Sequence, residues 1–175
     1  MLIVRVITLI WLFLGSVGYA LAGEINGAIG GESTRGFCLS DDDLEYVLIE
    51  ISVRKLGAML GTCVLKYPNL APQGLESGRK FNTKYSAQIS AYGKLAKEAL
   101  EVHGLSAGQR EQTYKQAEQV AIALAQTYSE KQCHNVISAL HGFVVMGDFA
   151  GVKLVITPRA DFQSARASTP PCSAH

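Results

Sequence analysis

"FCLSDDDLEYVLIEISVRKLGAMLGTC" (Phe37–Cys63) places a cysteine at each end of a segment with helical spacing. Ser40 followed by three aspartates is typical of a helix N-terminus, because a serine hydroxyl caps backbone N–H groups and carboxylates favour the positive end of the helix dipole. Beyond this cap, apolar residues recur on two neighbouring helical stripes as far as Tyr67. So wide an apolar face predicts a central helix, packed on more than one side, that ends where Pro68 and Pro72 interrupt the chain.

Two further long helices follow. The apolar spacing predicts a second helix, plainest over 81–103 and stopped by Gly104. A third is predicted over 106–142, opened by Ser106 and Gln109 in the arrangement of a capping box. Short connections between helices of similar length favour antiparallel neighbours, so the sequence predicts an all-α, up-down-up bundle of three long helices.

The remainder of the chain is less regular. A small C-terminal segment after Gly142 is compatible with a short helix or a strand, since Val152–Ile156 is a short apolar run, and we expect it to pack over the bundle. The predicted bundle domain therefore covers 38–160. Residues 161–175 are expected to form a loose C-terminal tail.

The N-terminus resembles a secretory signal peptide. Arg5 precedes an apolar run, and small residues at Ala20 and Ala22 favour cleavage after residue 22. An uncleaved membrane anchor is the alternative, because the apolar stretch approaches the roughly 20 residues that span a bilayer. Residues 23–37 contain five glycines and no apolar periodicity, which predicts a flexible lead. We therefore expect an exported protein, periplasmic or secreted, from a bacterial cell.

Charge and cysteine content narrow the function. Removal of residues 1–22 takes away Arg5 and leaves equal numbers of acidic and basic side chains. A neutral domain is a poor match for nucleic acid, because phosphate binding requires a basic excess. All four cysteines lie beyond residue 22, and an even number in an exported protein predicts two disulfides.

Helix lengths predict how these cysteines pair. At about 1.5 Å per residue, Cys63 lies roughly 33 Å along the first helix, and Cys133 lies roughly 40 Å along the third. Both helices begin at the same end of an up-down-up bundle, so Cys63 and Cys133 should meet near the opposite end. Cys38 remains at the starting end, too far from either for a disulfide, and is left for Cys172 in the C-terminal tail.

Motifs for catalysis, metals or cofactors are not found in the sequence. The adjacent residues Cys133 and His134 would point about 100° apart on a helix. The triplet Asp41, Asp42 and Asp43 lacks the spacing of a calcium loop and is explained by helix capping. His103 is interpreted as a residue favoured by the helix C-terminus. No catalytic residue, metal ligand or cofactor is predicted.

Two groups of residues stand out as candidate binding sites. Aromatic side chains on the inward stripes of the second and third helices are either ordinary core or the lining of a ligand cavity. They are Phe81, Tyr85, Tyr92, Tyr114 and Tyr128. Basic side chains should gather at the end of the bundle near Cys63, as a solvated face or as a surface for an anionic partner such as lipid headgroups or an acidic protein. They are Lys66, Arg79, Lys80, Lys84 and Lys131.

Three functional hypotheses follow from these features. The leading one is a non-enzymatic envelope protein, cross-linked by disulfides, that acts through contact with another protein. The second is a carrier of a small apolar or amphipathic ligand, held in a cavity between the helices. The third is an enzyme of unfamiliar type, whose polar groups converge only in the folded chain.

Overall fold

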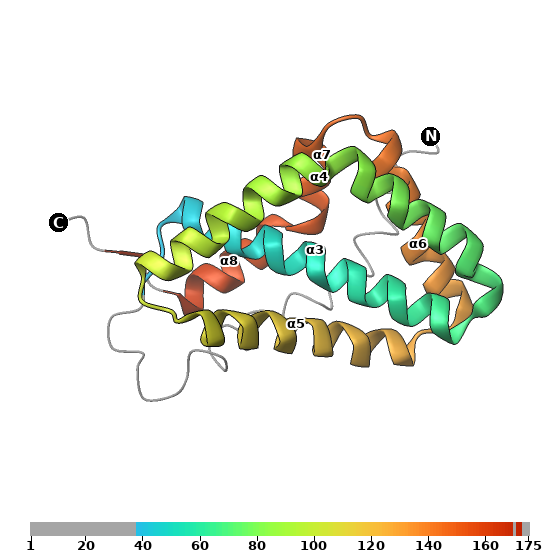
Figure 1. Ribbon diagram of the computed structural model, residues 1–175, viewed down its shortest axis with the longest axis horizontal. Helices are drawn as coiled ribbons and strands as arrows, with labels where there is room; N and C mark the ends of the chain where they lie inside the picture. Colours follow the sequence, from blue (N-terminus) through green and yellow to red (C-terminus); the bar gives the residue numbers. More distant parts are fainter. Residues whose placement is uncertain (1–37, 170, 173–175) are drawn as a thin grey trace.

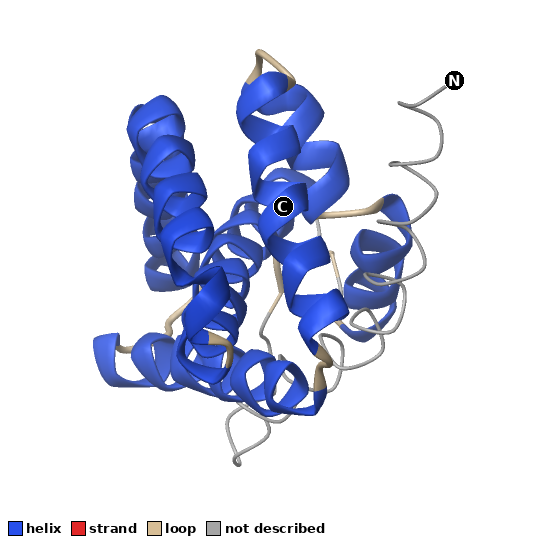
Figure 2. Cartoon of the chain, turned by 90° about the vertical axis from the view of Figure 1, so that its right-hand side faces the viewer, coloured by secondary structure: helices blue, strands red, loops and turns tan. Residues whose placement is uncertain are grey.

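A computed structural model of the protein describes residues 38–169, 171 and 172, and these residues are almost entirely helical (Figures 1 and 2). They form α3 (Asp41–Lys66), a 3₁₀ turn η1 (Pro68–Leu70), α4 (Ala71–Val102), α5 (Ala107–Thr127), α6 (Glu130–Val145), α7 (Phe149–Ile156) and α8 (Arg159–Ser168). No strand occurs in this part of the chain. The predicted all-α fold is therefore confirmed. The predicted signal peptide (1–22) and glycine-rich lead (23–37) lie outside the described residues.

Helix α3 is the central element, as its wide apolar face predicts. Ser40 caps it, and the backbone N–H of Asp43 donates to Ser40 Oγ at 3.1 Å. Along its length α3 contacts α4, α5, α6, α7 and α8. In Figure 1, α3 lies between α4 and α5, α3 and α5 run from left to right, and α4 runs back from right to left. The start of α3 therefore lies beside the end of α4.

The contact between α3 and α4 depends on two glycines in the first turns of α4. A Cβ atom on Gly74 would overlap Val64 Cγ1, and one on Gly78 would lie 2.8 Å from Leu60 Cδ2. Helix α4 begins at Ala71, before the stretch 81–103 in which its apolar spacing is plainest. Pro72 is compatible with this start, because proline is tolerated in the first turn of a helix, where its missing N–H is not needed.

The third predicted helix is divided in two, so the prediction of one helix over 106–142 is wrong. Tyr128 adopts an extended conformation after α5, and Ser129 begins α6 with a second capping box. In this box the Gln132 N–H donates to Ser129 Oγ, and Gln132 Oε1 accepts from the Ser129 N–H. Helix α6 then turns back and packs against α4 and α3.

The C-terminal segment is helical, which resolves the ambiguity after Gly142 in favour of helix. The N–H of Gly151 donates to the Asp148 carboxylate at 2.8 Å, which caps α7. Helix α8 covers most of the region predicted to be a loose tail, and that prediction is wrong there because Ala165 is fully buried against the bundle. No helix among the described residues is both long enough and apolar enough to cross a bilayer.

Candidate functional site

Two disulfides close the bundle at opposite ends. Cys63 is joined to Cys133 and Cys38 is joined to Cys172, so the predicted pairing is confirmed. We call the end that carries Cys63, Cys133 and the α5–α6 turn the Cys63 end. The Cys38 end carries Cys38, Cys172, the start of α3 and the end of α4.

The disulfide at the Cys63 end lies in an apolar core. Both cysteines have no exposed surface. Their cluster contains the apolar side chains of Met59, Leu70 and Ile137, together with Ala121, Ala125 and Tyr128. A thiol or metal ion in solvent cannot reach this bond without opening the packing around it.

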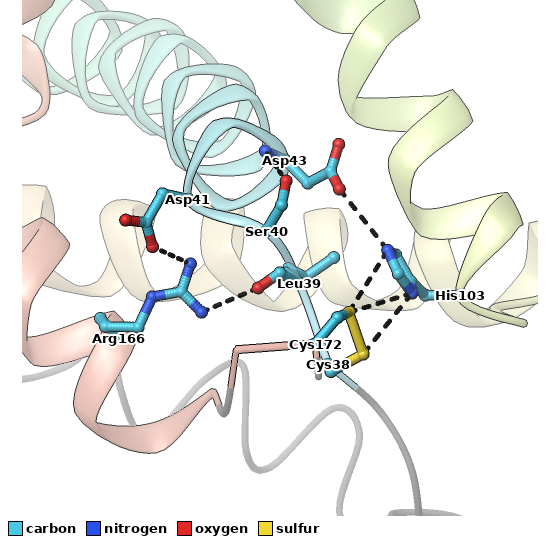
Figure 3. Close-up of polar contacts among 8 residues, drawn as sticks. All are labelled: Cys38, Leu39, Ser40, Asp41, Asp43, His103, Arg166 and Cys172. Carbon is cyan, nitrogen blue, oxygen red and sulfur yellow. Dashed lines mark hydrogen bonds and ion pairs between the residues drawn. A yellow bond between two sulfur atoms is a disulfide. The ribbon is translucent and has the colours of Figure 1, made fainter. Parts of the chain in front are cut away.

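The disulfide at the Cys38 end has polar neighbours and is partly exposed (Figure 3). His103 Nδ1 lies 4.0 Å from Cys38 Sγ and 3.8 Å from Cys172 Sγ. His103 Nε2 lies 3.5 Å from Asp43 Oδ2 and 4.0 Å from Cys172 Sγ. The imidazole is therefore placed between a carboxylate and both sulfur atoms.

Local structure explains how these residues meet. His103 is the C-cap of α4, and Gly104 ends that helix with φ +87°, a conformation that glycine adopts without steric cost. Asp43 lies in the first turn of α3, two residues beyond the start of the helix. Because α3 and α4 are antiparallel, the end of one helix brings His103 to the beginning of the other.

Helix α8 supplies the remaining contacts of the site. Arg166 NH1 donates to the carbonyl of Leu39 at 2.9 Å and to that of Thr169 at 3.1 Å. Arg166 NH2 forms an ion pair with Asp41 at 2.6 Å. One guanidinium thus ties the residue after Cys38 to the segment that leads to Cys172.

The arrangement has the residue types of a metal or redox site. Among the described residues, Cys38, His103 and Cys172 form the one group of three whose ligand atoms are close enough for a single metal ion, all within 4.8 Å of one another. Cysteine binds metal ions as a thiolate. Here the two sulfurs are bonded to each other, so neither of them is a thiolate. In the oxidised protein the group is therefore a disulfide with an adjacent imidazole.

Of the five basic residues predicted to gather at the Cys63 end, four lie toward that end and Lys84 does not. Lys66 Nζ donates to the carbonyls of Gln126 and Tyr128, where it caps the end of α5. Arg79 and Lys80 both pair with Glu76 on the exposed face of α4.

Lys84 lies apart from the other predicted cations. Its Nζ donates to the carbonyl of Val144 near the end of α6. Lys84 is about 20 Å along α4 from its start and so is distant from the Cys63 end. Lys131 is exposed in the first turn of α6 and does lie at that end.

The five predicted aromatic residues do not line one cavity. Phe81, Tyr85 and Tyr92 pack with Phe143 and Phe149 in one cluster, with ring centroids between 5.3 and 6.2 Å apart. The Tyr85 hydroxyl is satisfied there, since it donates to the Phe143 carbonyl at 2.6 Å. Tyr114 and Tyr128 belong to two other clusters.

Tyr114 is a buried polar side chain that contacts charged groups. The Arg54 guanidinium lies over its ring, 4.4 Å from the centroid, and Arg54 also pairs with Glu50 and Glu118. Burial raises the pKa of Tyr114 to about 12, and the nearby charge of Glu50 acts in the same direction. The hydroxyl therefore remains protonated across the physiological range.

Two buried charged residues lie on α3 and α8, the two helices that pack against each other here. Lys55 and Asp161 are both buried. Burial raises the pKa of the Asp161 carboxyl, and the charge of Lys55 opposes this effect. Neither residue was singled out in the sequence, because each occupies an ordinary position on a helix until α8 folds against α3.

The sequence contained a usable signal for the histidine site. Antiparallel packing of the first two helices requires that His103 and Asp43 lie at one end, and Cys38 was already placed there. By contrast His134, next to the other disulfide in sequence, has its Nδ1 near Ser138 Oγ at 3.4 Å on the exposed face of α6.

The chain was compared with models of protein families, with curated proteins and with solved structures. No family model, no curated protein and no solved structure matched this chain. A function must therefore be inferred from the side chains that the fold brings together.

Proposed function

We propose that this protein is an exported, non-enzymatic binding protein of the cell envelope that acts by contact with another protein. The observation that carries the proposal is the exposure of two leucines: Leu65 is 83% exposed and Leu75 is 62% exposed. They follow Val64 and Gly74, whose contact joins α3 to α4, so both lie at the Cys63 end. Large apolar side chains in solvent favour burial against a partner.

Export is supported by the two disulfides. Disulfides form and persist in oxidising compartments such as the periplasm or the extracellular space. The signal-peptide pattern of residues 1–22 leads to the same compartment. The proposed location is therefore periplasmic or secreted.

The charges near the leucines favour an acidic partner. Lys66, Arg79, Lys80 and Lys131 outnumber the carboxylates Glu76 and Glu130 at this end. The hydrogen bonds from Lys66 to backbone carbonyls leave its positive charge unneutralised. A protein surface with an apolar centre and a carboxylate rim would match both features, since opposite charges at a rim steer association.

Rigidity supports a binding role as well. The disulfide between Cys63 and Cys133 joins α3 to α6 at the same end of the bundle as the exposed leucines. A surface that is already ordered loses less conformational entropy when it binds. The Cys63 end is thus suited to present a fixed surface to a partner.

Photo-crosslinking from the Cys63 end tests the proposal. A photoreactive residue at position 75 of the full chain, expressed in the exporting cell, should yield one predominant protein adduct. Val102 provides a matched control, because it is an equally apolar residue, 81% exposed, at the other end of α4. Equal adduct patterns from positions 75 and 102 would contradict the proposed surface.

Charge variants test the acidic character of the partner. Arg79→Gln with Lys80→Gln should weaken binding of the crosslinked partner roughly threefold to tenfold, because two exposed charges contribute up to about 1 kcal/mol each. Lys94→Gln with Lys97→Gln is the matched control, since these lysines also pair with carboxylates on α4. Neither pair should change the melting temperature appreciably, because exposed substitutions cost little.

Salt dependence adds an independent check. Binding should weaken as salt rises from about 50 to about 200 mM, because exposed charges are screened over about 10 Å at 0.1 M. Vesicles that contain phosphatidylglycerol test the membrane alternative. If the protein binds these vesicles and no protein adduct forms at position 75, the surface belongs to lipid headgroups and the proposal is wrong.

A further inference from the structure

We propose that the Cys38–Cys172 disulfide is a thiol–disulfide exchange site, at which an external dithiol reductant reversibly opens the bond with assistance from His103. Three observations point to this chemistry. The bond is partly exposed, an imidazole faces both of its sulfurs, and a separate contact through Arg166 holds the two cysteine segments together. The disulfide at the Cys63 end differs in the first two features, because both of its cysteines are fully buried in an apolar cluster and no described imidazole lies against its sulfurs.

The position of His103 suits the departing sulfur. Exchange begins when a thiolate attacks one sulfur of the bond and expels the other as a thiolate. Because Nδ1 lies within 4.0 Å of both Cys38 Sγ and Cys172 Sγ, the imidazole is close to the leaving sulfur whichever one is attacked. An N–H at Nδ1 can donate to that sulfur and stabilise its negative charge.

Asp43 is a positioning residue in this arrangement. With a proton on each ring nitrogen, His103 donates from Nε2 to Asp43 and from Nδ1 toward the sulfurs. The carboxylate thus fixes the ring orientation in the way that second partners commonly orient a functional histidine. Asp41, in the same turn, pairs with Arg166 and does not contact the imidazole.

The complete reaction transfers two electrons to the protein. The first thiolate of the dithiol attacks one cysteine sulfur and forms a mixed disulfide, while the other cysteine leaves as a thiolate and takes up a proton. The second thiol of the dithiol loses its proton and attacks the mixed disulfide, which releases the second cysteine. The dithiol leaves as a disulfide, having lost two electrons and two protons, and Cys38 and Cys172 become thiols.

Arg166 makes the reaction reversible. Its guanidinium donates to the carbonyl of Leu39, next to Cys38, and to that of Thr169, three residues before Cys172. Thr169 is buried, and its N–H donates to the Ala165 carbonyl at the end of α8. These contacts do not involve the sulfurs, so the thiols of the reduced protein stay close and have a high effective concentration for bond formation.

The fold survives reduction at this site. The second disulfide, Cys63–Cys133, remains intact, and α8 is still held by Ala165, Asp161 and Arg166. Exchange at the Cys38 end is therefore a local event. The protein acts as a substrate of a dithiol, which places this site beyond the proposed binding function of the Cys63 end and independent of it.

Reduction kinetics of the full oxidised chain test the proposal directly. The protein is treated with dithiothreitol, free thiols are trapped by alkylation at intervals, and peptides are mapped by mass spectrometry. Alkylation at Cys38 and Cys172 should proceed at least about 100-fold faster than at Cys63 and Cys133, because a buried bond reacts only after local opening. Equal rates at the two disulfides would overturn the proposal.

Variants of the histidine and the carboxylate isolate their roles. His103→Asn should slow reduction of Cys38–Cys172 about tenfold or more, because the leaving thiolate loses its donor. Asp43→Asn should slow it less, by roughly threefold, because the ring is present but less well oriented. His134→Asn and Asp42→Asn are matched controls, one a histidine beside the other disulfide and the other an exposed aspartate in the same helical turn.

The reduction rate of Cys38–Cys172 in the His103→Asn variant shows whether His103 assists the reaction or only stabilises the local fold. If His103 only stabilised the local fold, its replacement would expose the disulfide and accelerate reduction. A slower reaction in His103→Asn, with an unchanged circular dichroism spectrum, therefore supports assistance by the imidazole. A rate that is unchanged or faster would overturn it.

Equilibration in a glutathione redox buffer tests the role of Arg166. Arg166→Gln should lower the effective concentration of the two thiols about tenfold, which corresponds to a reduction potential about 30 mV higher for this two-electron couple. Arg159→Gln, an exposed arginine at the start of α8, is the control and should leave the potential unchanged. An unchanged potential in Arg166→Gln would overturn the claim that this contact makes the bond reversible.

Discussion

The two ends of the bundle are closed by the same covalent bond in opposite surroundings. At the Cys63 end the sulfurs are completely buried among apolar side chains. At the Cys38 end they are partly exposed and contact an imidazole. The bond alone therefore does not determine what a disulfide does, because its neighbours decide whether a reagent can reach it and whether a leaving thiolate is stabilised.

The comparison also separates two contributions to stability. The Cys38–Cys172 bond spans 134 residues of sequence and the Cys63–Cys133 bond spans 70. Loop-closure entropy alone would make the longer loop more stabilising by about 0.6 kcal/mol. Packing acts in the opposite direction, since the shorter loop is closed inside the core.

The largest expected effect comes from replacing each disulfide with two serines. Cys63→Ser with Cys133→Ser should lower the free energy of unfolding by about 2–4 kcal/mol more than Cys38→Ser with Cys172→Ser, because two hydroxyls would be buried without partners. Urea titrations of both double variants measure the difference. A larger loss at the Cys38 end would mean that loop length outweighs burial.

Alanine versions of the same pairs sharpen this comparison. Cys63→Ala with Cys133→Ala removes the bond without burying a hydroxyl. It should therefore recover part of the loss seen in the serine double variant. Identical stabilities of the serine and alanine pairs would show that the cross-link, and not the polarity of the core, dominates at the Cys63 end.

A smaller effect is expected from the glycine contact at the Cys63 end. Gly74→Ala should cost about 1–3 kcal/mol, because the new methyl group overlaps Val64 Cγ1 and is also close to Ile137. Gly61→Ala is the matched control, since nothing lies within 4 Å of its Cβ position and alanine is the better helix former by up to about 1 kcal/mol. Thermal unfolding should therefore move in opposite directions for the two variants.

The smallest effect concerns Tyr114 and is confined to alkaline solution. Burial holds its pKa at about 12 in the folded chain, while an unfolded tyrosine ionises near pH 10. The folded state binds more protons between these values, so the contribution of Tyr114 to stability is full below about pH 10 and is lost as pH rises toward 12. Urea midpoints of the wild-type protein and Tyr114→Phe, compared at several alkaline pH values, measure this loss. A constant difference between the two would contradict the raised pKa.

Much of the fold could be predicted because helix geometry is rigid. A rise of about 1.5 Å per residue fixed the height of Cys63, and the antiparallel arrangement then left one partner for each cysteine. The pairing was right although the third helix is broken. Cys133 lies only about one turn beyond the break, so it stays at the same end of the bundle.

The break between α5 and α6 has a signal in the sequence, but the continuous apolar periodicity obscures it. Ser129 and Gln132 form the same capping box as Ser106 and Gln109. The apolar spacing continues across Tyr128, however, and periodicity does not report a change of direction. The capping box at Ser129 indicates a new helix, whereas the apolar periodicity indicates one continuous helix. The capping box gives the correct boundary.

The candidate site was less predictable because it depends on tertiary packing. The Arg166 contacts exist only because α8 folds against α3, in a region that the sequence indicated to be loose. His103 was recognised as a helix-terminal residue, but its neighbours come from both ends of the described chain. Sequence patterns can assign His103 and Arg166 to helices. Their contacts depend on how those helices pack in the folded chain.

The longer disulfide also closes the chain from Cys38 to Cys172 into a covalent ring. A protease that cuts once anywhere between Cys38 and Cys172 leaves the two fragments attached to each other. A cut between Cys63 and Cys133 leaves them attached at both ends of the bundle. For a cut elsewhere in the ring, the partly exposed bond beside His103 is the last covalent link. Reduction of that bond then leaves the two fragments of a nicked molecule held together by packing alone.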